Sequence, residues 1–327
     1  MTVGSFMPPR SPLWATAFDR FSRAHPGVRL LHAEGEAVAS LSEVDALVAA
    51  RIDAEQLLKA TSLKALFLPL TGLNHLPLEL LQKRDIEVYN LHANAESVAQ
   101  NALAMTLAFF GRLIEFHNDL RTTRWHGFWV GKGAEDEWSS IFGKRCAILG
   151  TGAIGQALAG LFKAFRFEVV GYRLHPTNPL PPGFDRVEAI LERALAGADI
   201  VVSTLPLTAA TRGLLGRKEL EAMRGAFLVN VGRGEVIEEE ALYLALREGV
   251  IAGAGIDVWY TYPGPGETMR APSRFPIHEL ANVVLSPHVG GSTREASRDA
   301  AGLTLANLAS WLEKGVARNR VDLSEGF

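Results

Sequence analysis

The stretch from residue 144 to residue 155 constrains the fold of this 327-residue chain more than any other. A short apolar run leads into Gly150, Gly152 and Gly155, spaced as G-x-G-x-x-G, and a helix-compatible segment follows. Gly150 allows a tight turn, Gly152 lets a pyrophosphate approach the backbone, and Gly155 lets the helix lie close to the strand. A second apolar run comes after the helix. We therefore expect a dinucleotide site at the helix N-terminus, with a plain structural turn as the alternative.

Composition and charge exclude several classes of partner. The length fits about two domains, and a hydrophobic fraction of 48% with 21% charged residues is ordinary for a globular protein. A net charge of -3 without a Lys/Arg cluster gives no electrostatic case for nucleic acid. The longest apolar segment, residues 102–111, is about half of what a bilayer requires, so we expect no membrane partner.

The single cysteine, Cys146, lies in the apolar run before the glycine turn. It cannot form an internal disulfide, and its position predicts a buried packing role rather than a nucleophile. Residues 1–11 lack the pattern of a secretory signal. Together these features favour a reducing cytoplasm.

Residues 1–95 alternate short apolar runs with helical patterns, which predicts a small α/β domain with a parallel sheet. Thr71 and Gly72 follow the third predicted strand, residues 64–70. Backbone N–H groups in such a turn can bind an anion, although a simple strand-to-helix connection explains the same pattern.

The middle of the chain begins with an alanine-rich helical pattern at residues 94–110, whose apolar positions cover most of its circumference. We expect this helix to be buried on several sides. A glycine-rich loop is expected at residues 131–138. We expect the tryptophans near this loop to pack in an interface or in the core rather than to contact a ligand.

Loop signals follow several strands after the glycine motif. Arg233 comes after the predicted strand at residues 226–231, and His288 comes after the predicted strand at residues 282–285. Because the carboxyl ends of neighbouring parallel strands meet at one edge of a sheet, these two side chains can converge beside the dinucleotide. An arginine fork suits a carboxylate, and a histidine suits proton transfer. The acidic run at residues 238–240 is typical of a helix N-terminus, so we expect no metal site there.

In this order the motifs resemble one known family, the D-2-hydroxyacid dehydrogenases, which includes formate, phosphoglycerate and glyoxylate/hydroxypyruvate members. The resemblance runs from about residue 94 to residue 291. It is carried by Asn94-Ala-Glu-Ser-Val-Ala, Gly150-Thr-Gly-Ala-Ile-Gly155, Leu205-Pro-Leu-Thr-Ala-Ala-Thr-Arg-Gly213, Asn230-Val-Gly-Arg-Gly234, Gly255-Ile-Asp-Val258 and Ser286-Pro-His-Val-Gly-Gly291.

The resemblance implies an α/β fold with two similar doubly wound parallel-sheet domains, in which a Rossmann domain is inserted into a flavodoxin-like substrate domain. Residues 1–95 would begin the substrate domain, residues 96–291 would bind NAD(P), and residues 292–327 would return as a C-terminal helix. Dimers are usual in the family, so a homodimer is implied.

The implied activity transfers a hydride between a nicotinamide and C2 of a small 2-keto or 2-hydroxy acid of D configuration. Arg233 would hold the substrate carboxylate with the backbone of Thr71 and Gly72, and His288 would be the general acid for reduction and the base for oxidation. Asp257 would contact the nicotinamide amide. The residues implied around the cofactor are Gly150, Gly152, Ala153, Ile154, Gly155, Leu205, Pro206, Thr211, Val231, Gly232, Arg233, Asp257, His288 and Gly290.

Two positions depart from the family pattern. An acidic residue usually ends the second Rossmann strand and binds the adenosine ribose, but here Arg173 follows Tyr172. A cation can pair with a 2′-phosphate, so NADP is favoured over NAD, with a solvated Arg173 as the alternative. Most members also place a glutamate five residues beyond the position of Asp257, where this chain has Tyr262.

The loss of that glutamate concerns the catalytic histidine, because a paired carboxylate orients the imidazole and raises its pKa. Tyr262 is therefore assigned to the catalytic group, with Glu267 as another group that could reach His288 from the same loop. We expect activity to fall with rising pH earlier than in relatives that keep the glutamate. A dinucleotide-sensing scaffold without turnover, related to the corepressor branch of the family, is the alternative function.

Overall fold

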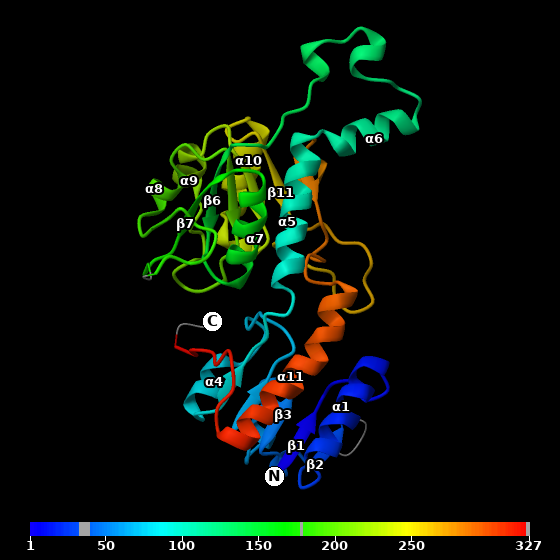
Figure 1. Cartoon of the computed structure of the whole chain (residues 1–327), viewed down its shortest axis with the longest axis vertical. Helices are drawn as coiled ribbons and strands as arrows, with labels where there is room; N and C mark the ends of the chain where they lie inside the picture. The colour runs from blue at the N-terminus through cyan, green and yellow to red at the C-terminus, as the bar shows by residue number, and fades with distance from the viewer. Residues whose placement is uncertain (33–39, 177–178, 325–327) are drawn as a thin grey trace. The chain divides into compact units, whose positions relative to one another are not determined.

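The computed structural model describes residues 1–32, 40–176 and 179–324, which form two compact units (Figure 1). Unit 1 consists of Met1–Asn94 and Ser292–Phe327, and unit 2 consists of Ala95–Gly291. Each unit has its own parallel sheet. In the part of the chain that is described, no helix combines the length and the apolar character that a membrane crossing requires.

Unit 1 contains a five-stranded sheet in the order β2-β1-β3-β4-β5, and every neighbouring pair is parallel. This is the flavodoxin-like order 2-1-3-4-5, so the predicted fold class is confirmed. The prediction did not include β1, which has a single apolar side chain larger than alanine. The strands are β1 (Thr2–Ser5), β2 (Arg29–His32), β3 (Ala46–Val48), β4 (Ala65–Phe67) and β5 (Glu87–Tyr89).

Helices cover both faces of this sheet, and each face has its own apolar cluster. Leu57 and Leu81 belong to one cluster, and Phe18 and Leu308 belong to the other. The helices are α1 (Pro12–Ala24), α3 (Ala54–Lys59), α4 (Leu78–Lys83) and α11 (Arg294–Lys314), with a 3₁₀ turn η1 (Leu41–Glu43). Helix α11 begins at the N-cap Thr293, whose side chain accepts a hydrogen bond from the N–H of Ala296.

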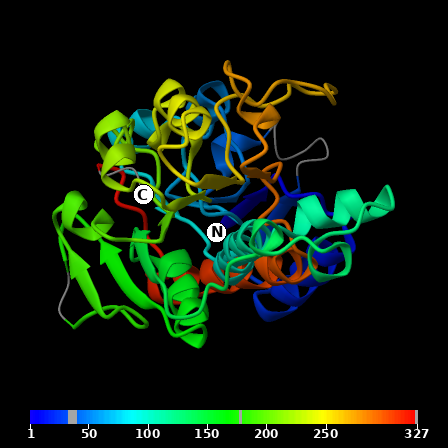
Figure 2. The same ribbon diagram turned by 90° about the horizontal axis from the view of Figure 1, so that it is seen from above.

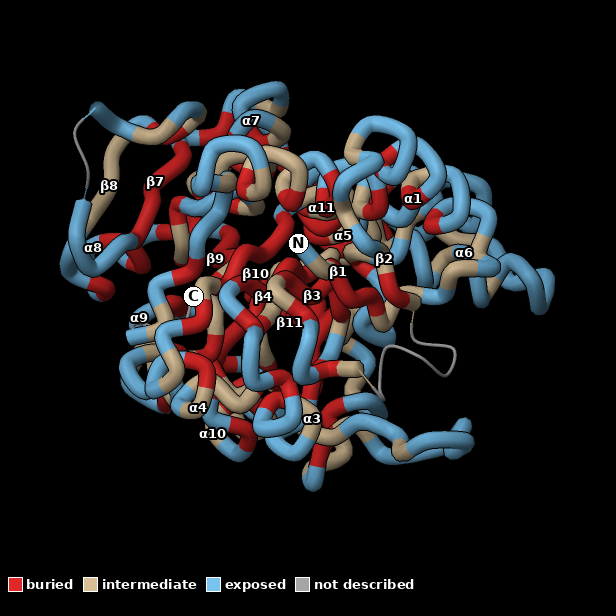
Figure 3. The backbone as a smooth tube through the Cα atoms, turned by 90° about the horizontal axis from the view of Figure 1, so that it is seen from below, coloured by how far each residue is buried: buried red, intermediate tan, exposed pale blue. Residues whose placement is uncertain are grey.

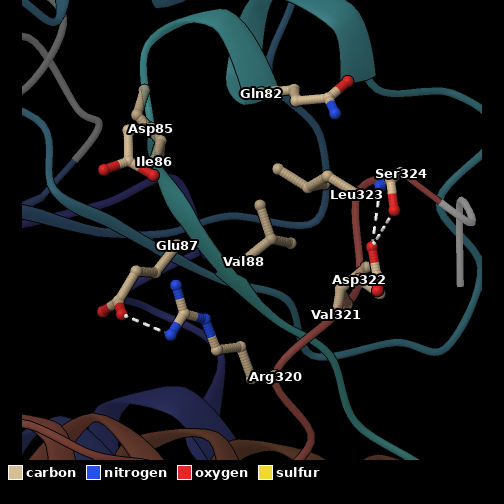
Figure 4. Close-up of a pocket in the computed structure, with 10 residues that line it drawn as sticks. All are labelled: Gln82, Asp85, Ile86, Glu87, Val88, Arg320, Val321, Asp322, Leu323 and Ser324. Atoms are coloured by element: carbon tan, nitrogen blue, oxygen red, sulfur yellow. Dashed lines mark hydrogen bonds and ion pairs between the residues drawn. The ribbon is translucent and has the colours of Figure 1, made fainter.

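A hollow of 410 Å³ lies beside β5 in unit 1 (Figure 4). Its polar side chains are largely bonded to one another or to the core: Arg320 pairs with Glu87 at 3.2 Å, and Asp322 accepts hydrogen bonds from the backbone and hydroxyl of Ser324. Glu87 also accepts a hydrogen bond from the indole of Trp311. These contacts hold the segment after α11 against the sheet.

Unit 2 contains a seven-stranded sheet in the order β12-β11-β10-β9-β6-β7-β8, again entirely parallel. The chain starts at β6, runs out to β8, and then crosses to β9 on the other side of β6. This reversal is the switch point at which doubly wound sheets bind their ligands. The strands are β6 (Arg145–Leu149), β7 (Glu168–Tyr172), β8 (Arg186–Glu188), β9 (Ile200–Ser203), β10 (Phe227–Asn230), β11 (Gly253–Ile256) and β12 (Val283–Leu285).

The central strands of unit 2 are buried on both faces (Figure 3). Val98 and Leu158 lie in the cluster on the side of α5 and α7, and Leu195 and Leu242 lie in the cluster on the side of α8, α9 and α10. Cys146 is fully buried in β6, and burial raises the pKa of its thiol, as expected for a packing residue. The helices are α5 (Ala95–Phe110), α6 (Leu113–Arg121), α7 (Ala153–Ala164), α8 (Leu191–Leu195), α9 (Arg217–Ala222) and α10 (Glu239–Arg247).

The loop expected at residues 131–138 contains one short 3₁₀ helix, η3 (Ala134–Asp136), and another, η2 (Gly127–Val130), directly precedes it. Two more follow β10 and precede β12, η4 (Gly234–Val236) and η5 (Ile277–Glu279). The tryptophans near the loop do not lie in the core of unit 2, because Trp125, Trp129 and Trp138 are all exposed.

Candidate active site

The glycine motif makes the predicted tight turn at the end of β6. Gly150 has a φ of +102°, and a Cβ there would lie 2.6 Å from the hydroxyl of Thr204. A Cβ at Gly155 would lie 2.1 Å from the carbonyl oxygen of Gly150, so the first turn of α7 approaches the strand too closely for any side chain. These two glycines are therefore required by the local geometry.

Space for a ligand remains at the middle glycine of the motif, Gly152. Within residues 1–32, 40–176 and 179–324, a Cβ at Gly152 would meet nothing within 4 Å, and no side chain caps α7, which begins at Ala153. The hydroxyl of Thr151 is buried and, among the described residues, has no hydrogen-bond partner. Free backbone N–H groups at a helix N-terminus, beside an open approach, are what a pyrophosphate requires. The residues present thus fit a dinucleotide.

The loops after β9 and β10 lie beside this turn, because β9 pairs with β6 and β10 pairs with β9. A Cβ at Gly232 would lie 2.4 Å from the carbonyl oxygen of Leu205, so the two loops touch. The hydroxyl of Thr211 donates to the carbonyl of Pro206 at 2.6 Å. Val231 is buried directly after β10, and Ile154 lies in the first turn of α7. The predicted cofactor residues therefore gather at the switch point.

Arg173 follows β7, the strand next to β6, and its side chain is exposed. Its backbone N–H donates to the carbonyl of Glu188 at 3.1 Å, which fixes the start of the loop. The carboxylate of Glu188 lies 3.4 Å from the guanidinium of Arg186. The position next to the turn thus carries a cation whose side chain reaches solvent.

Arg233 follows β10 in a turn that Asn230 holds. The amide of Asn230 donates to the carbonyl of Arg233 at 3.0 Å and accepts from the N–H of Gly232 at 3.2 Å. The guanidinium donates to the carbonyl of Gly232 at 2.7 Å. Burial lowers the pKa of Arg233 somewhat, and it remains a cation at every ordinary pH.

His288 lies in a turn after β12 and has a φ of +60°, which is left-handed backbone. The buried carboxylate of Asp257, at the end of β11, holds this turn through three hydrogen bonds. It accepts from the hydroxyl of Ser286, from the N–H of Val289 at 2.9 Å and from the N–H of Gly290 at 3.0 Å. These hydrogen bonds show that Asp257 shapes the turn. Contact between Asp257 and a nicotinamide stays a prediction.

Tyr262 lies beside His288, with the two ring centroids 5.4 Å apart. Its hydroxyl accepts a hydrogen bond from the backbone N–H of Trp259 at 2.9 Å, and the Trp259 indole donates to the carbonyl of Ser286 at 2.8 Å. Burial raises the pKa of Tyr262, so the phenol is neutral near pH 7. These bonds join the loop after β11 to the turn that carries His288.

The electrostatic surroundings of His288 favour its neutral form. Desolvation by the surrounding protein lowers its pKa most, the positive charge of Arg233 lowers it further, and Asp257 acts in the opposite direction. Glu267 accepts from the N–H of Gly264 and pairs with Arg270 at 3.2 Å. Its carboxylate is therefore engaged within its own loop.

Thr71 and Gly72 belong to unit 1, where they follow β4. The hydroxyl of Thr71 donates to the carbonyl of Leu91 at 2.8 Å, and the amide of Asn90 donates to the carbonyl of Thr71 at 3.0 Å. The turn is thus fixed at the carboxyl end of its sheet. Its contact with a substrate carboxylate stays a prediction.

Three supporting residues were not identified from the sequence. Asn230 was recognised only as part of a motif. An Asn or Asp side chain two residues before a glycine is nevertheless a known signal for a turn stabilised by that side chain. Trp259 and Ser286 act through bonds between loops that are distant in the sequence, for which the sequence carries no local signal.

Comparison with known proteins defines the class. Residues 103–290 match the family model for the D-isomer specific 2-hydroxyacid dehydrogenase NAD binding domain. A glyoxylate reductase of Thermococcus litoralis is 33% identical over 302 residues, which cover 88% of this chain and 86% of the relative. A glyoxylate/hydroxypyruvate reductase B of Yersinia pestis is 31% identical over 294 residues, with the same coverage.

Among solved structures, a protein of Thermus thermophilus has a TM-score of 0.74 and 31% identity, covering 98% of this chain and 100% of its own. The fold, the glycine turn and these relatives define an NAD(P)-dependent oxidoreductase. The chain belongs to the D-isomer specific 2-hydroxyacid dehydrogenase family.

Proposed function

We propose that this enzyme reduces a small 2-keto acid of the glyoxylate or hydroxypyruvate type, with His288 as general acid and Arg233 as carboxylate anchor. One observation carries the proposal. Arg233, Tyr262 and His288 follow the adjacent strands β10, β11 and β12, and their side chains are close enough for Arg233 to influence the pKa of both others.

Each side chain has a chemical task in this proposal. A bound nicotinamide supplies the hydride that C2 of the acid receives. Arg233 binds the carboxylate with two parallel N–H donors and draws electron density from the adjacent carbonyl. Protonated His288 gives its proton to the carbonyl oxygen, and in the oxidation direction neutral His288 removes it again. Thr71 and Gly72 add backbone donors to the carboxylate.

The test is the loss of reduced-cofactor absorbance with NADPH and with NADH against a panel of 2-keto acids. Turnover on glyoxylate, hydroxypyruvate or a larger 2-keto acid supports the proposal. Tight cofactor binding without turnover on the whole panel would instead favour a dinucleotide-sensing scaffold.

We expect NADPH to be preferred because Arg173 follows β7, where an acidic residue would bind the ribose of NADH. Replacing this cation in Arg173→Asp should lower kcat/KM for NADPH about tenfold or more, since one charge-assisted contact is lost and repulsion is added. The kcat/KM for NADH should not fall. Steady-state kinetics with both cofactors measures the ratio, and Arg224→Asp, another exposed arginine of unit 2, serves as the control. Equal losses for both cofactors would contradict a role in binding the 2′-phosphate.

The pH profile follows from the lowered pKa of His288. Reduction needs the imidazolium, so kcat/KM for reduction should fall as pH rises through a value below the ordinary 6.5. In Tyr262→Glu a carboxylate replaces the neutral phenol beside the ring, which should move this fall upward by about one pH unit or more. Tyr262→Phe, which keeps the ring, should leave the midpoint near that of the wild type. A wild-type profile that stays flat to above neutrality would contradict the assignment.

We also propose that the enzyme works as a homodimer in the cytoplasm. Its family resemblance and its exposed aromatic side chains in unit 2 support the dimer. The buried, unpaired thiol of Cys146 fits a reducing compartment.

A further inference from the structure

Residues 260–275 form a long loop between β11 and η5, which we call the aromatic loop because three of its side chains are aromatic. Its two ends are bonded to each other: the backbone N–H groups of Tyr260 and Thr261 donate to the carbonyl of Pro272 at 3.2 Å and 3.0 Å. The middle of the loop extends outward and is largely exposed (Figure 2). The position of the loop is therefore decided at its ends.

The buried carboxylate of Glu239 holds the returning end of the loop. Glu239 is the first residue of α10, and its side chain is only 8% exposed. One carboxylate oxygen accepts from the hydroxyl of Ser273 at 2.9 Å and from the N–H of Arg274 at 2.7 Å, and the other accepts from the Arg274 guanidinium at 2.6 Å. We call these three hydrogen bonds the clasp.

The carboxylate of the clasp is charged. Desolvation raises the pKa of Glu239, but the donors of Arg274 and Ser273 outweigh this effect, so the pKa lies below its ordinary value. A buried charge is stable only when it is bonded in this way. Glu239 and the returning end of the loop therefore depend on each other.

The same segment of chain holds the loop at two more points. The hydroxyl of Tyr260 donates to the carbonyl of Ile237 at 3.0 Å, and the ring of Phe275 stacks on Tyr243 of α10 with the centroids 5.3 Å apart. This segment comes directly after η4, which follows Arg233. Both ends of the aromatic loop are thus attached to the chain that leads from Arg233 into α10.

Tyr262 directly follows the first bonded end of the loop. Its ring lies beside the ring of His288, and its hydroxyl accepts from the N–H of Trp259. A glutamate at this position would be drawn to the imidazolium by its charge, whereas a phenol that is neutral near pH 7 has no such attraction. The place of Tyr262 is therefore set by the attachment of its own loop.

We propose that Glu239 is a positioning residue for His288: its hydrogen bonds to Ser273 and Arg274 close the base of the aromatic loop and thereby keep the ring of Tyr262 against the imidazole. The inference rests on the proposed function, in which His288 transfers the proton. In this scheme Glu239 acts on His288 only through Tyr262, whose ring keeps water from one side of the imidazole.

The inference predicts how His288 responds when the clasp is broken. Burial lowers the pKa of His288 most, Arg233 lowers it further, and Asp257 raises it. Glu235 of η4 acts by its charge on Arg233 and on Tyr262. These three charged groups lie outside the aromatic loop, so breaking the clasp removes only the burial that Tyr262 provides. The pKa of His288 should then rise toward 6.5, by about half a unit or more.

Two variants break the clasp. Glu239→Gln keeps the size of the side chain but places an amide N–H₂ where the Arg274 guanidinium donates. Loss of a negative charge by itself would lower the pKa of a histidine, so a rise in this variant separates positioning from a direct effect of charge. Ser273→Ala removes one bond without changing any charge and should raise the pKa of His288 by a smaller amount. It also keeps the proposal testable if Glu239→Gln does not fold.

The pKa of His288 is measured by NMR titration of its imidazole, assigned by comparison with His288→Asn, so the measurement needs no substrate. Glu240→Gln, at the next and exposed residue of α10, is the matched control and should leave the pKa unchanged. Tyr262→Ala should raise the pKa as well. Adding Glu239→Gln to Tyr262→Ala should give no further rise, because the clasp acts through that ring.

The pH dependence of kcat/KM for a 2-keto acid is measured on the same proteins. Since reduction needs the imidazolium, its fall at high pH should move upward by the same amount as the pKa. An unchanged or lowered pKa in both Glu239→Gln and Ser273→Ala would overturn the positioning role, whatever the turnover. A further rise of equal size in the double variant would overturn the route through Tyr262. A pKa that responds as expected in an enzyme that reduces no 2-keto acid would support the positioning role and contradict only the proposed reaction.

Discussion

Replacing His288 by asparagine should lower kcat for the reduction of a 2-keto acid by about 10²–10⁴-fold, the usual contribution of a positioned general acid. Asparagine is chosen over alanine because His288 has a φ of +60°, a conformation that asparagine adopts at little cost. The amide can fill the space of the imidazole but cannot transfer a proton to the carbonyl oxygen. Stopped-flow or steady-state measurement of NADPH consumption gives the ratio.

The control for this variant is His278→Ala, at a histidine of η5 whose side chain lies 3.8 Å from Glu279. It should retain wild-type turnover. The affinity for NADPH, followed by the fluorescence of the bound cofactor, should change little in His288→Asn. If kcat of His288→Asn stayed within a factor of about two of the wild type, His288 could not be the proton donor.

Replacing Arg233 by glutamine should lower kcat/KM for the 2-keto acid about 10³-fold, because two charge-assisted hydrogen bonds to the carboxylate are lost together. Arg233→Lys keeps the charge but loses the fork, so its loss should be smaller. Steady-state kinetics over a range of acid concentrations separates the effect on KM from the effect on kcat.

A second comparison shows whether the loss concerns the carboxylate itself. Reduction of the corresponding aldehyde, which has no carboxylate, should be nearly equal in the wild type and in Arg233→Gln. The exposed Arg224→Gln should match the wild type on both substrates. An equal loss on acid and aldehyde would mean that Arg233 supports the structure of the turn rather than the substrate.

The sequence was most informative where a local pattern has one physical cause. The spacing of Gly150, Gly152 and Gly155 predicts the turn that the structure contains: Gly150 and Gly155 have no room for a side chain, and Gly152 leaves the approach to α7 open. Apolar runs likewise predict β6, β7, β9, β10 and β11, because strands buried on both faces have to be continuously apolar. The edge strand β12 was also predicted from its apolar run, although its three residues are only partly buried or exposed. The short edge strand β8 has no such pattern, as its three residues are only partly buried, and it was not predicted.

Other features depend on contacts between distant residues. The placement of Arg233 and His288 at one edge of the sheet was inferred from general rules for parallel sheets. The strands that precede them, β10 and β12, both pair with β11. The hydrogen bonds from the turn at residues 286–290 to Asp257 could not be inferred from the sequence, because they depend on the register of β11 against β12. Nor could the pairing of Glu239 with Arg274, which depends on how the loop after β11 returns to α10.

The lone thiol in β6 makes this chain a clean background for spectroscopic labels. Cys146 is fully buried and its pKa is raised, so a maleimide probe has little thiolate to attack. Cysteines introduced at the exposed positions Leu58 in unit 1 and Met269 in unit 2 could then carry spin labels without first removing a native cysteine. Distance distributions from such a pair, with and without NADPH, would show whether binding of the cofactor changes the separation of the two labels.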